Sequence, residues 1–193
     1  MVLDRRKNKI FSVLERRQPD LTVVMEDIHD PHNVSAMFRS SDAVGIFSVN
    51  LIYTSQKFPK IGSKSSSSAN KWVGRRRFPS VAECYGQLRQ EGFQILATKL
   101  DENAKQLYEF DLTKPTAFVF GNEHAGVSDD AAQLADATVY IPMMGMIQSL
   151  NVSVACAVTI YEALRQRSTK GMYDASRFPK EELERLKEEW LKK

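Results

Sequence analysis

The chain has 193 residues, of which 42% are hydrophobic and 26% charged, and a formal net charge of +3. This size and composition predict one globular domain with enough chain to bury a core. No segment reaches the run of about 18 apolar residues that a membrane span requires, and no apolar stretch follows the basic N-terminus, so we expect neither membrane insertion nor export. Cys84 and Cys156 lack metal-ligand spacing, which predicts reduced structural thiols in a cytoplasmic protein.

The predicted elements alternate between strands and helices. After an N-terminal helix, short β-rich runs are predicted at 21–25, 48–53, 93–98, 116–120 and 137–141. Helical patterns occupy 33–44, 81–91, 129–135, 149–167 and 179–193. The alternation predicts an α/β fold with a mostly parallel sheet and helices on both faces. Because threaded chains are rare, the pattern alone predicts an ordinary open sheet.

Residues 1–20 are expected to form an N-terminal helical extension, 21–171 the main domain and 172–193 a C-terminal helix. The last helix carries Leu183, Leu186, Trp190 and Leu191 at helical spacing. This apolar face predicts packing on the body of the protein or on a partner subunit.

Positive charge is concentrated in a few stretches. Residues 56–77 contain seven cations and no acid, interleaved with Phe58 and Trp72, which predicts a mobile basic loop that contacts phosphates and stacks a base. The alternative is ordinary solvated surface. These cations are Lys57, Lys60, Lys64, Lys71, Arg75, Arg76 and Arg77. A second basic group, on the N-terminal helix, comprises Arg5, Arg6, Lys7, Lys9, Arg16 and Arg17. A third closes the 149–167 helix with Arg165, Arg167 and Lys170, where cations also complement the helix dipole.

The segment 141–158 combines a bent loop with a helix start. Pro142 and Gly145 interrupt the chain, and Ser149 is predicted to cap the helix that follows. The helix N-terminus beside this loop could hold a small polar ligand, although a capped core helix is the plainer interpretation. A buried apolar stripe is predicted at Leu150, Val154, Ala157, Tyr161 and Leu164. Core filling is the commoner use of methionines such as Met143, Met144 and Met146.

The helix near Asn33 separates polar from apolar positions. Its 3.6-residue repeat places His32, Ser35, Arg39 and Asp42 on one face and Val34, Met37, Phe38 and Val44 on another. From these residues alone, Arg39 would be an exposed cation paired with Asp42. Glu123 would likewise be a surface acid ahead of the turn at Gly126.

Three segments resemble the signature motifs of the SPOUT superfamily of RNA methyltransferases, in the same order. They are NVSAMFR at 33–39 followed by DAVG at 42–45, FGNEHAG at 120–126, and the stretch from Pro142 to Ala155 with its SLNVSVA. The resemblance covers about 18–171 and is closest to the TrmH branch, the tRNA guanosine 2′-O-methyltransferases. It implies a SPOUT fold with a C-terminal trefoil knot, whose loops form the pocket for S-adenosylmethionine.

The resemblance also implies an activity and an assembly. The expected reaction is 2′-O-methylation of tRNA ribose, at guanosine 18 in the D-loop, by a homodimer. No metal is expected, because the sulfonium is already activated and the three histidines are scattered. Alternatives are a 2′-O-methyltransferase for rRNA or another tRNA nucleotide, or a catalytically silent RNA-binding member. The presence of Arg39 argues against a catalytically silent member, and the short N-terminal helix argues against the branch that modifies rRNA.

Matching positions suggest the site residues. The predicted catalytic group is Arg39, Asn33, Glu123, Ser149 and Asn151. The predicted cofactor-binding group is Thr98, Gly121, Asn122, Ile141, Ser149 and Leu150. The predicted RNA-binding group is Arg16, Arg17, His32, Arg75, Arg76, Arg77, Arg165 and Arg167. Two roles remain open for Arg39, because a guanidinium is a poor general base at neutral pH: it anchors a phosphate, or a neighbouring phosphate lets it act as the base.

Overall fold

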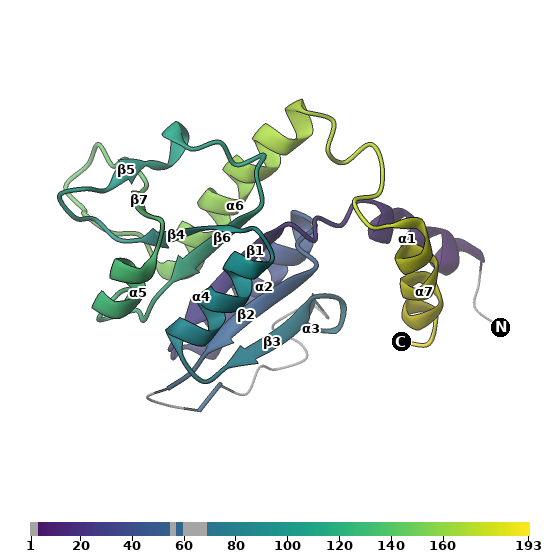
Figure 1. Cartoon of the computed structure of the whole chain (residues 1–193), viewed down its shortest axis with the longest axis horizontal. Helices are drawn as coiled ribbons and strands as arrows, with labels where there is room; N and C mark the ends of the chain where they lie inside the picture. Colours follow the sequence, from purple (N-terminus) through teal and green to yellow (C-terminus); the bar gives the residue numbers. More distant parts are fainter. Residues whose placement is uncertain (1–3, 55–56, 60–68) are drawn as a thin grey trace.

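A parallel sheet forms the centre of the molecule. The computed structural model describes residues 4–54, 57–59 and 69–193. Over these residues the sheet has seven strands in the order β3-β2-β1-β6-β4-β7-β5, and every neighbouring pair is parallel (Figure 1). The predicted parallel sheet is thereby confirmed. The strands are β1 (Leu21–Glu26), β2 (Ser48–Ile52), β3 (Gly74–Phe78), β4 (Gln94–Thr98), β5 (Lys105–Gln106), β6 (Thr116–Phe120) and β7 (Ala137–Tyr140).

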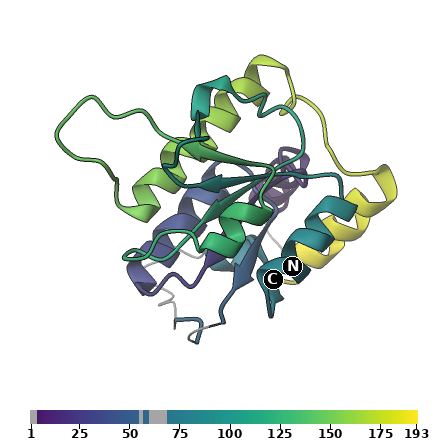
Figure 2. The same cartoon turned by 60° about the vertical axis from the view of Figure 1, so that its left-hand side comes forward.

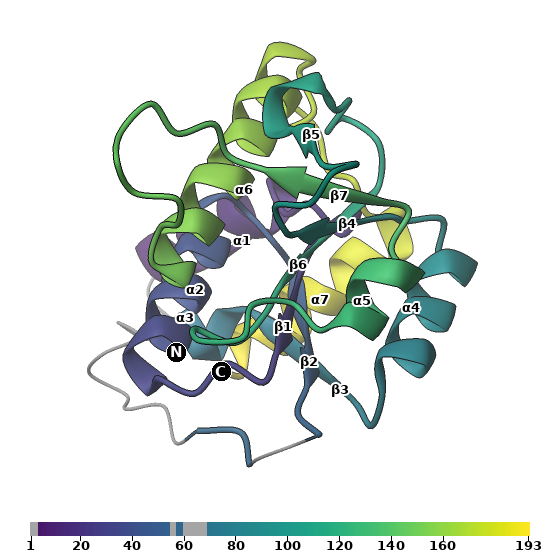
Figure 3. The same cartoon turned by 90° about the vertical axis from the view of Figure 1, so that its left-hand side faces the viewer.

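Helices cover both faces of the sheet, as predicted. In Figure 3, α2 (Pro31–Ala43) and α6 (Val152–Thr169) lie on one side of the sheet, and α4 (Val81–Gln90) and α5 (Asp129–Leu134) on the other. Side chains alternate along each strand, so Val23 and Met25 of β1 join the apolar cluster under α2 and α6, while Val24 joins the cluster under α4 and α5. None of the described helices is both long and apolar enough to cross a membrane. The helices are α1 (Asp4–Glu15), α2 (Pro31–Ala43), α3 (Ala69–Trp72), α4 (Val81–Gln90), α5 (Asp129–Leu134), α6 (Val152–Thr169) and α7 (Lys180–Leu191), with a 3₁₀ turn at Leu107–Glu109.

Both cysteines belong to these clusters. Cys84 lies under α4 and Cys156 under α6, and both are buried and free. Burial raises the pKa of the Cys84 thiol to about 12 and moves the pKa of Cys156 in the same direction. Both side chains therefore act as small apolar residues of the core.

The basic stretch is not simply a loop. Arg75, Arg76 and Arg77 lie in β3, at the edge of the sheet, where Asn50 of β2 is the register partner of Arg76. The loop prediction was wrong for these three residues. An edge strand has only one neighbouring strand, and its side chains can reach solvent, so arginine is tolerated there. Lys60, Lys64 and residues 65–68 lie outside the described residues.

The two terminal helices pack against each other. Ile10 and Leu14 of α1 form an apolar cluster with Leu183, Leu186 and Trp190 of α7 (Figure 1). The Trp190 ring also meets the Trp72 ring of α3, with centroids 5.1 Å apart. The apolar face of α7 is therefore covered within the chain, by α1 and by the α3 region.

The start and the buried face of α6 differ from the prediction. The helix begins at Val152, and Asn151 rather than Ser149 caps it: its Oδ1 accepts from the backbone N–H of Ser153 at 2.9 Å. The predicted stripe was also wrong, since Val154 and Tyr161 are 48% and 49% exposed. The buried residues are instead Cys156, Thr159, Ile160, Ala163 and Arg167. Apolar residues surround much of this helix, so periodicity alone did not select the face that packs.

Two arginines expected to bind RNA are inside the fold. Arg167 is fully buried, and its guanidinium donates to Leu112 O at 2.9 Å, to Asp20 Oδ1 at 2.6 Å and to further acceptors at Gln18 and Lys114. Arg17 is also fully buried and pairs with Asp42. The RNA-binding predictions for these two residues were wrong, because both guanidinium groups are inside the fold, where Asp20, Asp42 and backbone carbonyl groups accept hydrogen bonds from them.

Replacing Arg167 with alanine should destabilise the fold. The change leaves several buried acceptors without their donor, so we expect a loss of about 3–5 kcal/mol in the free energy of unfolding. Arg165 provides the control: it is exposed and paired with Glu162, and Arg165→Ala should cost less than about 1 kcal/mol. Denaturant unfolding measures both values, and equal losses would contradict the structural role of Arg167.

Candidate active site

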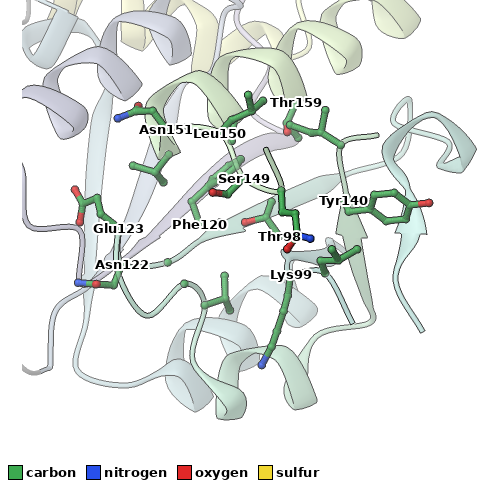
Figure 4. A pocket seen from close by; sticks show the side chains of 18 of the residues that line it. Thr98, Lys99, Phe120, Asn122, Glu123, Tyr140, Ser149, Leu150, Asn151 and Thr159 are labelled. Carbon is green, nitrogen blue, oxygen red and sulfur yellow. The ribbon is translucent and has the colours of Figure 1, made fainter. Parts of the chain in front are cut away.

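A cavity of about 960 Å³ opens at the carboxyl ends of β4, β6 and β7 (Figure 4). Three loops and the first turns of α6 line it, which is where parallel sheets commonly hold ligands. The structure brings the whole predicted cofactor group together on its wall: Thr98, Gly121, Asn122, Ile141, Ser149 and Leu150.

Two glycines shape the loop after β6. A Cβ atom on Gly121 would lie 2.1 Å from the carbonyl oxygen of Gly126, so only glycine fits this close approach of two backbones. Gly126 has φ +71, a conformation that favours glycine. Asn122 closes the same turn, because its Oδ1 accepts from the backbone N–H groups of His124 at 2.8 Å and Ala125 at 3.1 Å.

Three of the predicted catalytic residues form one hydrogen-bonded network. Asn33, near the start of α2, donates from Nδ2 to Glu123 Oε1 at 3.0 Å and accepts on Oδ1 from Asn151 Nδ2 at 3.1 Å. Glu123 also accepts from the backbone N–H groups of His29 at 3.0 Å and Asp30 at 3.1 Å. Glu123 and Asn151 stand on the cavity wall, so the network joins three distant segments at its edge (Figure 4).

These contacts keep Glu123 ionised. Burial raises the pKa of its carboxyl group, but the hydrogen bonds from Asn33 and from the His29 and Asp30 backbone outweigh burial and hold the pKa below its ordinary value. The interpretation of Glu123 as a plain surface acid was therefore wrong. The cavity has a fixed negative charge on one wall at neutral pH.

Sequence reasoning missed several cavity residues. Leu100 is 65% exposed and lies on the wall after β4, where the position after a strand end could have identified it. Thr159 of α6 is 1% exposed, and its hydroxyl has no hydrogen-bond partner among the described residues. No sequence signal distinguishes this threonine from a core residue, yet an unpaired buried hydroxyl at a cavity is suited to a polar ligand atom.

Other predicted site residues lie apart from the cavity. Arg39 is exposed on α2, two turns beyond Asn33, and is absent from the cavity wall. Asp42 pairs with Arg17, so the predicted Arg39–Asp42 pair was wrong. His32 and Arg39 are exposed as predicted, whereas Ser35 is buried. Ser149 is exposed on the cavity wall and caps no helix.

The remaining RNA-binding candidates are spread over several elements. Arg16, Arg75, Arg77 and Arg165 are exposed. Arg76 is engaged differently, because its Nη1 contacts both carboxylate oxygens of Glu91, at 2.7 and 2.9 Å, and its Nε donates to Asn50. Among the described residues, no cluster of three or more His, Cys, Asp or Glu side chains could hold a metal ion. The expected independence from metal stays a prediction.

Glu123→Gln should lower stability in a pH-dependent way. The folded-state pKa of Glu123 is depressed, so its stabilisation is present above the ordinary glutamate pKa and is lost as the pH falls through the lowered value. At pH 7 the variant should lose roughly 1.5–3 kcal/mol, the usual worth of hydrogen bonds to a charged group. Thermal melts from pH 7 to acid should show the gap closing, and a constant gap would contradict the ionised network. Glu102→Gln, in an exposed loop, is the control.

Comparison with known proteins assigns the chain to a family. The model of the SpoU rRNA methylase family matches residues 20–161. A tRNA (guanosine(18)-2′-O)-methyltransferase of Thermus thermophilus is 45% identical over 190 residues, covering 98% of this chain and 97% of the relative. The crystal structure of a TrmH/SpoU tRNA modifying enzyme of Aquifex aeolicus superposes with a TM-score of 0.92 at 39% identity, covering 98% and 96% of the two chains. The SpoU methyltransferase AviRb of Streptomyces viridochromogenes, solved with the cofactor AdoMet, superposes with a TM-score of 0.63 at 28% identity and covers 80% and 59%. The chain belongs to the SpoU methylase family.

Proposed function

We propose that this protein transfers a methyl group from S-adenosylmethionine to the 2′-oxygen of guanosine 18 in tRNA. The observation that carries the proposal is the network of Asn33, Glu123 and Asn151 at the edge of the three-loop cavity. The relative from Thermus thermophilus, which carries this activity in its name, matches nearly the full length of the chain.

The cavity fits S-adenosylmethionine. Leu100, Ile141 and Leu150 offer apolar surface to a flat adenine, and the unpaired hydroxyl of Thr159 offers a hydrogen bond. Ionised Glu123 favours a ligand with cationic groups. When bound, the cofactor supplies an already activated methyl group, and AviRb is a family member solved with it.

The residues of this chain supply orientation and a route for the proton. Glu123 holds the loops around the cavity in place through Asn33 and the β1–α2 loop. Arg39 either grips the phosphate next to the reacting ribose or relays the 2′-hydroxyl proton to that phosphate, giving up one of its own protons as it takes the proton of the ribose. Both roles align the 2′-oxygen with the methyl group, and alignment supplies much of the rate in such transfers.

The activity can be tested with an unmodified tRNA transcript. The purified protein, S-adenosylmethionine and EDTA should produce one 2′-O-methylguanosine per tRNA, at position 18, by nuclease digestion and mass spectrometry. Methylation of another tRNA nucleotide or only of rRNA would favour the alternative substrates. RNA binding without methylation would favour the silent member, and a loss of activity in EDTA would contradict metal independence.

Arg39→Ala should separate catalysis from cofactor binding. We expect the turnover number to fall about a hundredfold or more, because Arg39 acts in the transition state, while cofactor affinity stays nearly unchanged, because the loops after β4, β6 and β7 form most of the cavity wall. Arg39→Lys should restore little of the turnover, since one ammonium group cannot reproduce the paired hydrogen bonds of a planar guanidinium to a phosphate. Steady-state kinetics and calorimetry measure both quantities. Normal turnover with only a raised KM for tRNA would reduce Arg39 to an anchor.

The edge strand β3 should bind the tRNA backbone through only two of its arginines. Strand alternation places Arg75 and Arg77 on the side of α2 and Phe58, and Arg76 on the other side with Glu91. Arg75→Gln with Arg77→Gln should weaken binding to all tRNAs alike and reduce the salt slope by about 0.7–0.9 per lost contact. Arg76→Gln is the matched control. An unchanged salt dependence of tRNA binding in the double variant would show that Arg75 and Arg77 are ordinary solvated residues.

A homodimer explains the exposed apolar surface around the cavity. Val154 and Tyr161 of α6 are half exposed, and Met144, Met146 and Ile147, between β7 and α6, are exposed. Figure 2 shows that the loop between β7 and α6 extends away from the body of the protein. Core filling was therefore the wrong expectation for Met144 and Met146. Apolar surface of this kind is typical of protein interfaces. Since Arg39 lies outside the cavity of its own chain, we propose that a second copy supplies it.

Hybrid dimers test this arrangement. Arg39→Ala and Asn151→Ala chains, each inactive alone, should regain activity when mixed, because one hybrid site combines an intact cavity with an intact Arg39. Half of randomly mixed dimers are hybrids with one working site of two, so about a quarter of wild-type activity is expected. No recovery in verified hybrids would place the whole site within one chain.

We also propose that the C-terminal part of the main domain, 21–171, is threaded as a trefoil knot. After β7, near one edge of the sheet, the chain returns to pack α6 against α2 and to place Asn151 against Asn33. This return path supports threading beneath the loops that follow β4 and β6. The terminal pair, from 1–20 and 172–193, stands outside the knot. The cytoplasmic location stays a prediction.

A further inference from the structure

An ion pair between a buried arginine and a partly exposed carboxylate holds the C-terminal end of α2. Arg17, just beyond α1, pairs through Nη2 with the Asp42 carboxylate, and its Nη1 donates to the carbonyl oxygen of Ile46 at 2.9 Å. The same guanidinium lies over the Trp190 ring of α7, 5.3 Å from its centroid. One fully buried side chain therefore joins α1, α2 and α7.

Neighbouring hydrogen bonds reinforce this junction. The backbone N–H of Gln18 donates to Gly45 O at 2.8 Å, and the Tyr173 hydroxyl donates to Val44 O at 2.8 Å. Both acceptors lie directly after α2. The end of α2 is thus held from the exit of α1 and from the connector between α6 and α7.

Stability alone does not account for an ion pair here. Arg17 is fully buried while Asp42 keeps 35% of its side chain exposed, so the desolvation of the guanidinium offsets part of their attraction. Arg17 Nε and the Ser41 hydroxyl are also buried without a hydrogen-bond partner among the described residues. What the pair adds is a fixed orientation of α2, because the hydrogen-bonded carboxylate of Asp42 sets the rotation of the helix about its own axis.

That rotation determines where Arg39 points. Arg39 precedes Asp42 by three residues, about one helical turn, so a rotation of Asp42 moves Arg39 with it. Three of the exposed residues of α1, Arg5, Arg6 and Lys9, are basic. RNA bound there would be held in a fixed relation to Arg39.

We propose that Arg17 and Asp42 are positioning residues for Arg39, which hold α2 in the orientation that presents Arg39 to RNA bound on α1. This inference rests on the methyl transfer proposed above. Arg17 is buried and acts through α2 rather than on the substrate.

Two conservative variants test the proposal. Asp42→Glu and Arg17→Lys keep the charges but alter the length or the fork of the contact. The single-turnover rate of methyl transfer should fall about tenfold or more, since small misplacements of catalytic groups are costly, while the Kd values for tRNA and cofactor stay within about twofold. Combined with Arg39→Lys, either variant should slow transfer no further, because both act through the same group.

Arg89→Gln is the control, since it breaks an exposed ion pair with Asp136 on the opposite face of the sheet and should leave the rate unchanged. Hydrogen exchange gives a readout without catalysis: peptides spanning 39–46 should exchange faster in both variants, and peptides of α4 should not.

If the wild type methylates tRNA and the variants match its rate, or if their losses multiply with that of Arg39→Lys, the inference is overturned and the proposed function stands. A wild type that modifies no tRNA overturns the proposed function, and unchanged exchange at 39–46 overturns the positioning of α2 on its own.

Discussion

The carboxylate of Glu123 accepts three hydrogen bonds that bring the cavity edge together. Two donors are backbone N–H groups between β1 and α2, at His29 and Asp30, and the third is Asn33. Because β1 and β6 are neighbours in the sheet, their carboxyl ends deliver these donors and this acceptor to the same place. Asn33 then extends the network to Asn151, so the start of α6 is held by a contact that begins at β6.

This arrangement depends on backbone packing as much as on side chains. Glu123 reaches the β1–α2 loop only because the chain turns sharply after β6, where the backbones of Gly121 and Gly126 nearly touch. Any side chain at position 121 would push the turn outward and carry Glu123 with it. The glycines thus shape the site, and the charged and amide groups occupy the positions that this turn provides.

Sequence reasoning captured the features that repeat along the chain. Strands alternating with helices identified the parallel sheet, and the apolar face of α2, including Met37 and Phe38, is buried as its spacing predicts. Features that depend on tertiary contacts could not be predicted from the sequence pattern. Three consecutive arginines gave no strand signal, although an edge position next to β2 accommodates them. Ser149 and Asn151 are both polar residues that could cap α6. Asn151 is the one that caps it, and the same side chain contacts Asn33.

The arginines illustrate the same limit. Arg165 and Arg167 are two residues apart on α6, which places them on nearly opposite sides of the helix, one in water and one in the core. Composition treats them as equal, whereas the acceptors around Arg167, Asp20 among them, make that arginine structural. The motif residues themselves came from the family resemblance, while Thr159 on the cavity wall became visible only in three dimensions.

The pairing of α1 with α7 has a consequence for how the protein is made. α1 precedes the strands of the central sheet in the chain and α7 follows them, so Ile10 and Leu14 gain their contacts with Leu183, Leu186 and Trp190 only after those strands have been synthesised. Contacts between such distant parts of a chain form slowly, because a long loop must close before they are gained. The central sheet can assemble while α1 waits. The contact between α1 and α7 therefore forms after the strands of the sheet are available, and a nascent chain would acquire its sheet before this helix pair.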